Sequence, residues 1–418
     1  MLNIMTYDFK KIRRGAEELR EELVRIRRIV HENPELGFVE NETAKLIKEK
    51  LDALGIPYKS EIAKTGIVAT ITGDQPGKTL AIRADMDALP IQENTGLEFA
   101  SKNAGVMHAC GHDTHVSCLL GAATLLNNLK SELKGSVKLL FQPAEEGSSL
   151  YDPTFKIAGG ARPMVLEGAV GDPNNPEIDA VLALHIGAGD RPAAQVGKIG
   201  VTDGPSSGSA DEFYITIKGK GGHASAPHNA VDPVFVAAQV YINIQGWLSR
   251  VINPMEPVVF TVGKIVGGFR HNIISDTCQM DCTLRTLNEE VRSKIKEELP
   301  KLISAIATGY NASADIEIRT GYPVGSNSKI MNDHIRSVFT DMYSADDIAV
   351  RGPILGAEDF YEFGFKNSIP ISMFGLGGAN PEKDYISPNH SSKFRIDEDA
   401  LPIGTAVLAA TAISYLNS

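Results

Sequence analysis

The chain has 418 residues, of which 43% are hydrophobic and 22% are charged, and its formal net charge is −11 at pH 7. A chain of this length exceeds the size at which a single hydrophobic core stops growing, so we expect two domains. The acidic balance, with lysine and arginine scattered along the chain, argues against a surface for nucleic acid or anionic membranes.

The first predicted element is a charged helix over residues 9–30. Its apolar residues Leu19, Leu23, Ile26 and Val30 recur at helical spacing, which is typical of an amphipathic surface helix and not of a secretory signal. No apolar run approaches the roughly 18 residues that span a bilayer. The cysteines, at positions 110, 118, 278 and 282, lack the spacing of a disulfide framework. We therefore expect a cytoplasmic protein.

Short apolar segments that read as buried strands follow. They cover residues 65–72, 79–87, 136–146 and 178–187, with a helical pattern at 43–55 before the first strand and another at 117–129 between the second and third. Runs of Val, Ile and Leu that alternate with helices indicate an α/β fold with a mostly parallel sheet.

Polar side chains gather where these predicted strands end. The second strand ends in Asp85 and Asp87, the third in Glu145 and Glu146, and the fourth in His185. The histidine-rich stretch VMHACGHDTH, residues 106–115, lies between the second and third strands. Because ligands bind beyond the carboxyl ends of strands in open α/β sheets, we expect these groups to meet at one edge.

A smaller α+β domain is predicted over residues 196–311, inserted into a domain formed by 1–195 and 312–418. Its helix after residue 232 has Asp and Pro as start signals, and a second helix is expected at 289–309. Cys278 and Cys282 fall on one face of an alternating strand, which predicts half-buried packing for both.

The residue types at the predicted edge allow metal chemistry. A thiolate at Cys110 and an imidazole at His112 are good ligands for Zn²⁺ and related ions, with a cysteine nucleophile and a histidine base as the alternative. If one of the two adjacent glutamates binds metal, the other is available as general base; the alternative is an exposed acidic turn. His185 could also be a satisfied buried histidine, and His223 a polar hairpin residue.

The motifs RADMDALP, HACGHDTH, FQPAEEG, LALHIG, GKGGHASAPH and NHSSKF occur in this order in the chain. In this the sequence resembles the metal-dependent aminoacylase/carboxypeptidase amidohydrolases, in the branch of indole-acetyl-amino-acid hydrolases, hippurate hydrolases and N-acyl-amino-acid deacylases. The resemblance runs from about residue 20 to the C-terminus. It implies two divalent metal ions per subunit, Zn²⁺ or Mn²⁺ with Co²⁺ or Ni²⁺ as alternatives. It also implies an inserted lid domain that forms a homodimer, with a tetramer as the alternative.

The resemblance also implies roles for individual residues. The metal ligands would be Cys110, His112, Glu146, His185 and His390, with Asp85 and Asp87 supporting them from outside the ligand set. Glu145 resembles the general base, and His223 resembles the lid histidine that stabilises the oxyanion in the other subunit's active site. Asn272 and Arg285 resemble lid residues that hold the substrate's carboxylate, and Gly356, Glu358 and Asp359 would line the pocket.

The expected function is metal-dependent cleavage of the amide bond in N-acyl or aryl-acyl amino acids, by an activated water with Glu145 as base. A dipeptidase or carboxypeptidase on the same scaffold is the alternative. Two further alternatives are a non-catalytic metal-dependent binding protein and a nucleotide-dependent α/β enzyme. The stretch between the EEG motif at 145–147 and His185 is longer than usual for this branch. Within it, we expect the segment 148–158 to affect the mouth of the pocket and hence substrate size.

Overall fold

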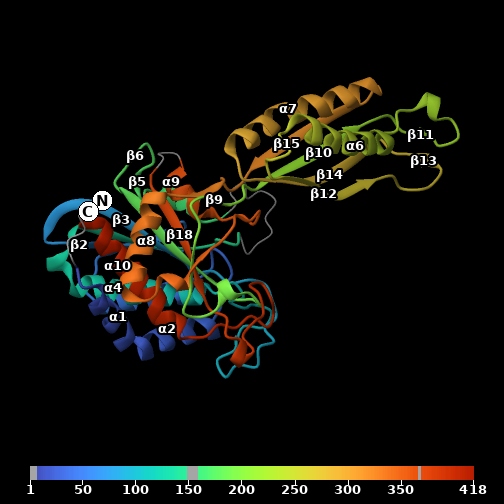
Figure 1. The fold of residues 1–418 in the computed structure, drawn as a ribbon. Helices are drawn as coiled ribbons and strands as arrows, with labels where there is room; N and C mark the ends of the chain where they lie inside the picture. The colour runs from blue at the N-terminus through green and yellow to red at the C-terminus, as the bar shows by residue number, and fades with distance from the viewer. Residues whose placement is uncertain (1–6, 148–158, 366–368) are drawn as a thin grey trace. The chain divides into compact units, whose positions relative to one another are not determined.

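The computed structural model describes residues 7–147, 159–365 and 369–418 (Figure 1). Its contacts divide the chain into two compact units. The first, here the large unit, holds Met1–Gly204, Ser326–Gly352 and Asp359–Ser418; the second, the inserted unit, holds Pro205–Gly325 and Pro353–Glu358. The predicted insertion at 196–311 begins 9 residues before Pro205 and ends 14 residues before Gly325, and it does not include Pro353–Glu358.

The large unit is built on an eight-stranded sheet in the order β1-β2-β4-β3-β7-β18-β8-β17. Its strands are β1 (Tyr58–Ile62), β2 (Gly66–Thr72), β3 (Gln75–Asp85), β4 (Lys134–Gln142), β7 (Ala180–Gly187), β8 (Ile199–Val201), β17 (Ile348–Val350) and β18 (Ile371–Gly377). Strands β4, β3, β7 and β18 are mutually parallel, so their carboxyl ends share one edge. This confirms the predicted α/β class with a mostly parallel sheet.

Strand β2 runs antiparallel to its neighbour β4, unlike the parallel core. Only residues 73–74 separate β2 from β3, and so short a connection reverses the chain. Two parallel strands need a crossover of a dozen residues or more, so β2 and β3 cannot be parallel.

Helices cover both faces of this sheet. They are α1 (Phe9–Glu18), α2 (Arg20–Glu32), α3 (Asn41–Ala53), α4 (His112–Asn128), α5 (Ala161–Leu166), α8 (Lys329–Met342), α9 (Glu362–Phe365) and α10 (Ala400–Leu416). The predicted N-terminal helix is therefore two helices, which meet at Leu19. Within the described ranges, no helix is both long enough and apolar enough to cross a membrane.

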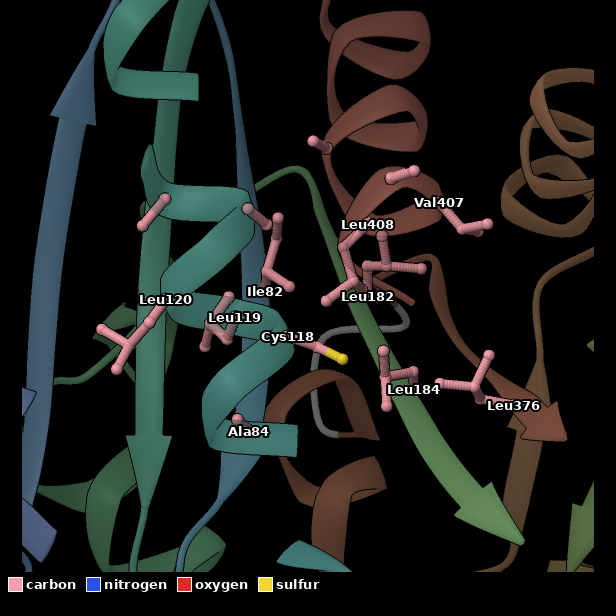
Figure 2. Packing of buried hydrophobic residues seen from close by; sticks show 14 of the residues in the cluster. Ile82, Ala84, Cys118, Leu119, Leu120, Leu182, Leu184, Leu376, Val407 and Leu408 are labelled. Atoms are coloured by element: carbon pink, nitrogen blue, oxygen red, sulfur yellow. The ribbon is translucent and has the colours of Figure 1, made fainter. Parts of the chain in front are cut away.

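The two faces of the sheet have different neighbours, which positions the site described below. Leu182 and Leu184 of β7 pack with Leu119 of α4 and Leu408 of α10 in the main core (Figure 2). Cys118 is fully buried in the same core. The alternate residues of β7 point to the opposite face, where a second cluster forms around Phe360.

The inserted unit is a four-stranded antiparallel sheet, in the order β12-β14-β10-β15, with α6 and α7 on one face (Figure 1). Its main elements are β10 (Asp211–Lys218), α6 (Pro233–Val251), β12 (Val258–Gly267), β14 (Thr277–Thr286), α7 (Glu289–Gly309) and β15 (Ser313–Thr320). Cys278 and Cys282 lie on the core face, as their spacing predicts, and are buried more completely than the expected half-buried packing. The remaining short strands of the described residues form three pairs. They are β5 (Gly171–Asp172) with β6 (Asn175–Pro176) in the large unit, β11 (Gly222–His223) with β13 (Ile273–Ile274) in the inserted unit, and β9 (Gly204–Ser207) with β16 (Gly325–Asn327).

Candidate metal centre

The carboxyl ends of three parallel strands bring the first polar groups together. Asp85 of β3 pairs with Gln142 of β4, and Arg83 pairs with Ala183 of β7. Two residues further along, Asp85 and His185 therefore lie at one level of the sheet and on one face. The strand ends thus deliver a carboxylate and an imidazole to the predicted edge.

The start of α4 adds Cys110 and His112 beside these strands. Gly111 precedes the helix with a φ of 89°, and a Cβ on it would lie 2.2 Å from Ile186 Cγ2. Only glycine combines this left-handed conformation with so close an approach to β7. Gly111 therefore lets the two candidate ligands flank a sharp turn pressed against the sheet.

The end of β4 differs from the sequence-based prediction. The strand stops at Gln142, and Glu145 and Glu146 lie in the turn that follows, not in the strand. Ala144 turns the chain with a φ of 50°, and its N–H donates to the buried carboxylate of Glu40 at 2.8 Å. The orientation of the two glutamates is therefore set by this turn and not by strand alternation, and their carboxylates lie close enough to form one group with His112.

The five predicted ligands form two groups that share one atom. Cys110, His112 and His185 offer ligand atoms within 4.8 Å of one another, and Cys110, Glu146 and His390 form a second such group. Cys110 Sγ lies 3.5 Å from His185 Nε2, and His390 Nε2 lies 3.0 Å from Glu146 Oε1. One thiolate common to two sets of N and O donors suits a pair of divalent cations.

The histidine hydrogen bonds fit such cations. His112 Nδ1 donates to the Asp87 carbonyl at 2.9 Å, which leaves a lone pair on its buried Nε2, an atom without a hydrogen-bond partner among the described residues. His185 Nδ1 donates to the Ile186 carbonyl at 2.8 Å, so its Nε2 lone pair faces Cys110. A backbone acceptor on one ring nitrogen is the usual way in which proteins orient a metal-binding histidine.

Asp85 and Asp87 support this arrangement from outside both groups. Asp87 holds His112 Nδ1 with one carboxylate oxygen at 3.1 Å and accepts the Glu146 N–H with the other at 2.9 Å. Asp85 accepts from the Arg83 guanidinium at 2.6 Å and from His115 Nδ1 at 2.5 Å. Both aspartates thus fix the orientation of neighbouring site residues.

His115 and Asn389 belong to the site although sequence reasoning assigned them no role. His115 Nε2 accepts the Ile186 N–H at 2.8 Å, so with Nδ1 bound to Asp85 neither ring nitrogen is left for a metal. The Asn389 amide donates to the carbonyls of Cys110 and Ile186, at 2.9 and 3.1 Å. The available signals were the i,i+3 spacing of His115 from His112 and the position of Asn389 beside His390.

The electrostatics of the cluster favour the thiolate of Cys110 and the carboxylate of Glu146. Burial would raise the pKa of the Cys110 thiol, but the neighbouring His185 and His112 outweigh it and lower this pKa to about 6. Hydrogen bonds that the His390 imidazole donates to Cys110 and Glu146 raise the pKa of His390 to about 10. Burial works against the charged form of Glu146 as well, but the hydrogen bond from His390 lowers the pKa of this carboxyl.

Glu145 is a buried carboxylate at the edge of the cluster. Its Oε2 lies 3.9 Å from His112 Nε2, and it forms a further group with His112 and Glu146. The carboxylate is therefore close to the shared ligands without belonging to either of the two groups around Cys110.

The predicted lid residues lie on the inserted unit, where the structure brings together only two of the three. His223 of β11 pairs with Ile273 of β13, and the neighbouring Ala224 N–H donates to the Asn272 carbonyl at 3.2 Å. Arg285 lies near the other end of β14, eight residues beyond its start at Thr277. At about 3.3 Å per residue that is roughly 26 Å along the strand, so a single chain does not place Arg285 beside His223.

The remaining predicted pocket residues lie in or directly after Pro353–Glu358, the second segment that the chain contributes to the inserted unit. Gly356 and Glu358 belong to the inserted unit, where the Gly356 carbonyl accepts the Gly208 N–H at 2.9 Å and Glu358 is buried. Asp359, in the large unit, is buried and accepts hydrogen bonds from the Gln142 amide and the Ala161 N–H. The segment 148–158, expected to affect the pocket mouth, lies outside the described residues.

Comparison with known proteins places these residues in a family context. The family model described as Peptidase family M20/M25/M40 matches residues 81–414. Thermostable carboxypeptidase 2 of Saccharolobus solfataricus is 40% identical over 98% of this chain and 99% of its own length. The N-acetyl-L-cysteine deacetylase of Bacillus subtilis is 37% identical over 96% of this chain and 89% of its own.

Solved structures agree with this match. A protein from methicillin-resistant Staphylococcus aureus superposes with a TM-score of 0.88 at 31% identity, covering 98% of this chain and 100% of its own. A dinuclear metal binding peptidase from Bacillus subtilis superposes with a TM-score of 0.78 at 33% identity, covering 96% and 99%. The similarity therefore extends over both units.

Proposed function

Because this chain belongs to peptidase family M20/M25/M40, we propose that it is a metal-dependent amidohydrolase that cleaves the amide bond of N-acyl amino acids. The observation that carries the proposal is the pair of ligand groups sharing Cys110, with the Glu145 carboxylate beside them. The carboxypeptidase relative at 40% identity makes short peptides the second candidate substrate class. Substrates of both classes contain an amide bond, which the same reaction would hydrolyse.

We propose that Cys110, His112 and His185 hold one divalent ion and Cys110, Glu146 and His390 a second, each ion being Zn²⁺ or Mn²⁺. The N, O and S donors suit Zn²⁺, and the carboxylate also admits Mn²⁺. Bound ions would supply Lewis-acid polarisation of the scissile carbonyl and a lowered pKa for water.

Glu145 is proposed to act as the general base. It removes a proton from the attacking water and later delivers this proton to the nitrogen of the leaving amine. Its burial keeps bulk water away from the carboxylate, which strengthens its interactions with charged neighbours. On the inserted unit, the imidazole of His223 is proposed to donate a hydrogen bond to the oxyanion in the active site of a second subunit.

A homodimer is proposed to supply that second subunit. Strand β12 is an edge of the inserted unit's sheet, and it exposes Val259, Ile265 and Val266. On α6 of the same unit, Phe235 and Ile242 are exposed as well. An apolar edge strand with unpaired backbone groups is suited to pairing with an identical strand across a twofold axis. The free thiols agree with the cytoplasmic location proposed for the dimer.

The proposed function is tested by amine release from N-acetyl and N-benzoyl amino acids and from dipeptides. The protein is first stripped with a chelator and then supplied with Zn²⁺ or Mn²⁺. We expect activity to be lost on chelation and regained with metal, and the preferred acyl group to distinguish deacylase from carboxypeptidase. No cleavage of any substrate by protein with bound metal would favour a binding protein.

The role of Glu145 is tested in the same assay with Glu145→Gln. The amide keeps the shape of the side chain but cannot accept a proton, so kcat should fall by a factor of about 10² or more. Metal content measured by elemental analysis should stay at the wild-type value, since Glu145 lies outside both proposed ligand groups. Near-wild-type turnover in this variant would remove the proposed role.

A further inference from the structure

An arginine of the large unit crosses the sheet face beside the candidate metal centre. After β17, the side chain of Arg351 lies over β8 and β18. A Cβ on Gly200 would lie 2.2 Å from Arg351 Cδ, and a Cβ on Gly375 would lie 2.2 Å from Arg351 Nη1. Gly200 and Gly375 are directly paired between the two strands, so together they leave a groove that the arginine fills.

This groove adjoins the proposed ligand His185. Gly375 pairs in parallel register with His185, so the two residues face the same side of the sheet. Neighbouring strands are about 4.8 Å apart, which places the guanidinium on the order of 5–7 Å from the His185 Cβ. Arg351 therefore lies one strand away from the site.

The guanidinium of Arg351 has no anionic partner. Among the described residues it takes part in no ion pair or side-chain hydrogen bond; only its backbone carbonyl accepts a hydrogen bond, from Thr202 at 2.8 Å. Burial and the positive charge of Arg191 lower its pKa. By contrast, the buried Arg27 and Arg83 of the same unit each pair with an aspartate.

A half-buried cation without a counter-ion is costly unless a ligand compensates it. A purely structural arginine would gain from a carboxylate neighbour, and a purely steric filling of the groove would not require a charge. The planar guanidinium binds carboxylates through two parallel hydrogen bonds, which fixes both position and orientation. The observed surroundings are those of a receptor for a negatively charged group.

We propose that Arg351 binds the α-carboxylate of the amino-acid part of the substrate, an inference that rests on the proposed function. In an N-acyl amino acid this carboxylate is three bonds from the scissile carbonyl carbon, a separation of about 4 Å or less. A substrate whose carbonyl lies at Cys110 and His185 thus reaches the guanidinium across β18. This residue lies in the large unit and is separate from Asn272 and Arg285 of the inserted unit.

The proposal is tested with two substrates that differ only at that group, N-acetyl-L-alanine and N-acetyl-L-alaninamide. We expect Arg351→Met to lower kcat/KM for the acid by about 10- to 100-fold and to leave that for the amide within about twofold, because the lost interaction is charge-assisted. Arg351→Lys keeps the positive charge but cannot form two parallel hydrogen bonds. Its kcat/KM for the acid should lie between those of the wild type and Arg351→Met. Methionine retains the apolar stem over the two glycines, so folding is preserved.

A second variant leaves the arginine in place and displaces it. Gly375→Ala puts a methyl group 2.2 Å from Arg351 Nη1, too close for both to stay in place, and the flexible end of the arginine side chain can move aside. We expect it to reduce the preference for the acid in the same way as Arg351→Met. The matched control is Arg191→Met, which removes an exposed positive charge nearby and should leave the acid-to-amide ratio unchanged.

An equal fall for both substrates, or no change for either, in Arg351→Met would overturn the proposal. If the wild type with bound metal releases amine from neither substrate, the proposed function is overturned, but the role of Arg351 is not yet decided. Binding of N-acetyl-L-alanine, measured by calorimetry, then decides the role of Arg351. Binding to the wild type that is weakened at least tenfold in Arg351→Met supports it, whereas equal binding, or none by the wild type, overturns it.

Discussion

Glu40 is a fully buried carboxylate that holds the turn before Glu145. One oxygen accepts the Ala144 N–H at 2.8 Å, and the other accepts the Thr65 hydroxyl. Ala144 has a left-handed φ of 50°, which costs a residue with a Cβ on the order of 1 kcal/mol or more. The two hydrogen bonds of Glu40 compensate this strain and so position the proposed base.

The ionisation of Glu40 makes folding stability pH-dependent. Burial, reinforced by the negative charge of Asp87, raises the pKa of Glu40 to about 7 from an ordinary value near 4.5. The native state therefore binds this proton more tightly, and the stabilisation is fully present below pH 4.5 and lost as pH rises through 7. We expect Glu40→Gln to gain on the order of 3 kcal/mol relative to wild type between pH 4.5 and 8.

Urea unfolding of both proteins at pH 5 and pH 8 measures this difference. Other titrating groups cancel because the comparison is between two proteins at each pH. A constant difference between the proteins at both pH values would show that Glu40 has an ordinary pKa in the folded state.

At the residue scale, the sequence indicated the proposed ligands, the proposed base and the two supporting aspartates, but not Glu40 or Arg351. Cys110, His112 and His185 stand in dense motifs or at strand ends, where their residue types are informative. Glu40 contacts Ala144, which is 104 residues away along the chain. Arg351 lies over Gly200, which precedes it by 151 residues, and over Gly375, which follows it by 24. Such contacts follow from sheet topology, which local patterns do not contain.

At the scale of elements, residues 35–40, the segment before α3, contact two loops of the candidate site. The Glu35 carboxylate caps α3 by accepting the N–H groups of Asn41, Glu42 and Thr43, and the Glu35 carbonyl accepts the Ala88 N–H at 2.8 Å. Gly37 packs directly against the turn that carries the glutamates. The loop after β3 and the turn after β4 are therefore held by one segment.

Because this segment contacts both loops, we expect Gly37→Ala to lose both stability and activity. The added Cβ would lie 2.2 Å from the Gly147 carbonyl oxygen and 2.8 Å from Ala144 Cβ, so the turn has to shift. We expect a loss of about 1–3 kcal/mol in unfolding free energy and a fall in kcat of at least tenfold. Gly309→Ala, at a helix end with nothing within 4 Å, is the control and should change neither. Unchanged kcat in a destabilised Gly37→Ala would separate the segment from the site.

Elements with strong periodicity and start signals were predicted well. The helix expected at 289–309 is α7, Glu289–Gly309, and Asp232 caps α6 by accepting two backbone N–H groups. The strand expected at 136–146 ends four residues early, because Pro143 cannot donate to a sheet ladder and Ala144 leaves the extended conformation. Apolar character alone does not reveal such an ending.

At the scale of the whole molecule, the proposed homodimer makes each active site depend on two chains. A dimer of one Glu145→Gln and one His223→Ala subunit would have one site with both an intact base and an intact lid histidine. Mixing the two inactive proteins in equal amounts should therefore restore about one quarter of wild-type sites. Mass spectrometry of differently tagged subunits checks the exchange. No recovery after confirmed exchange would place the action of His223 within its own chain.

The position of β18 has a consequence for how the chain is made. This strand, Ile371–Gly377, lies between β7 and β8, although both of these precede it by more than 150 residues. During synthesis the large sheet stays divided until β18 has left the ribosome, by which time Pro205–Gly325 is already available to fold. We therefore expect the inserted unit to fold before the large sheet is complete. Because His390 emerges later still, we also expect metal to be loaded onto an essentially complete chain.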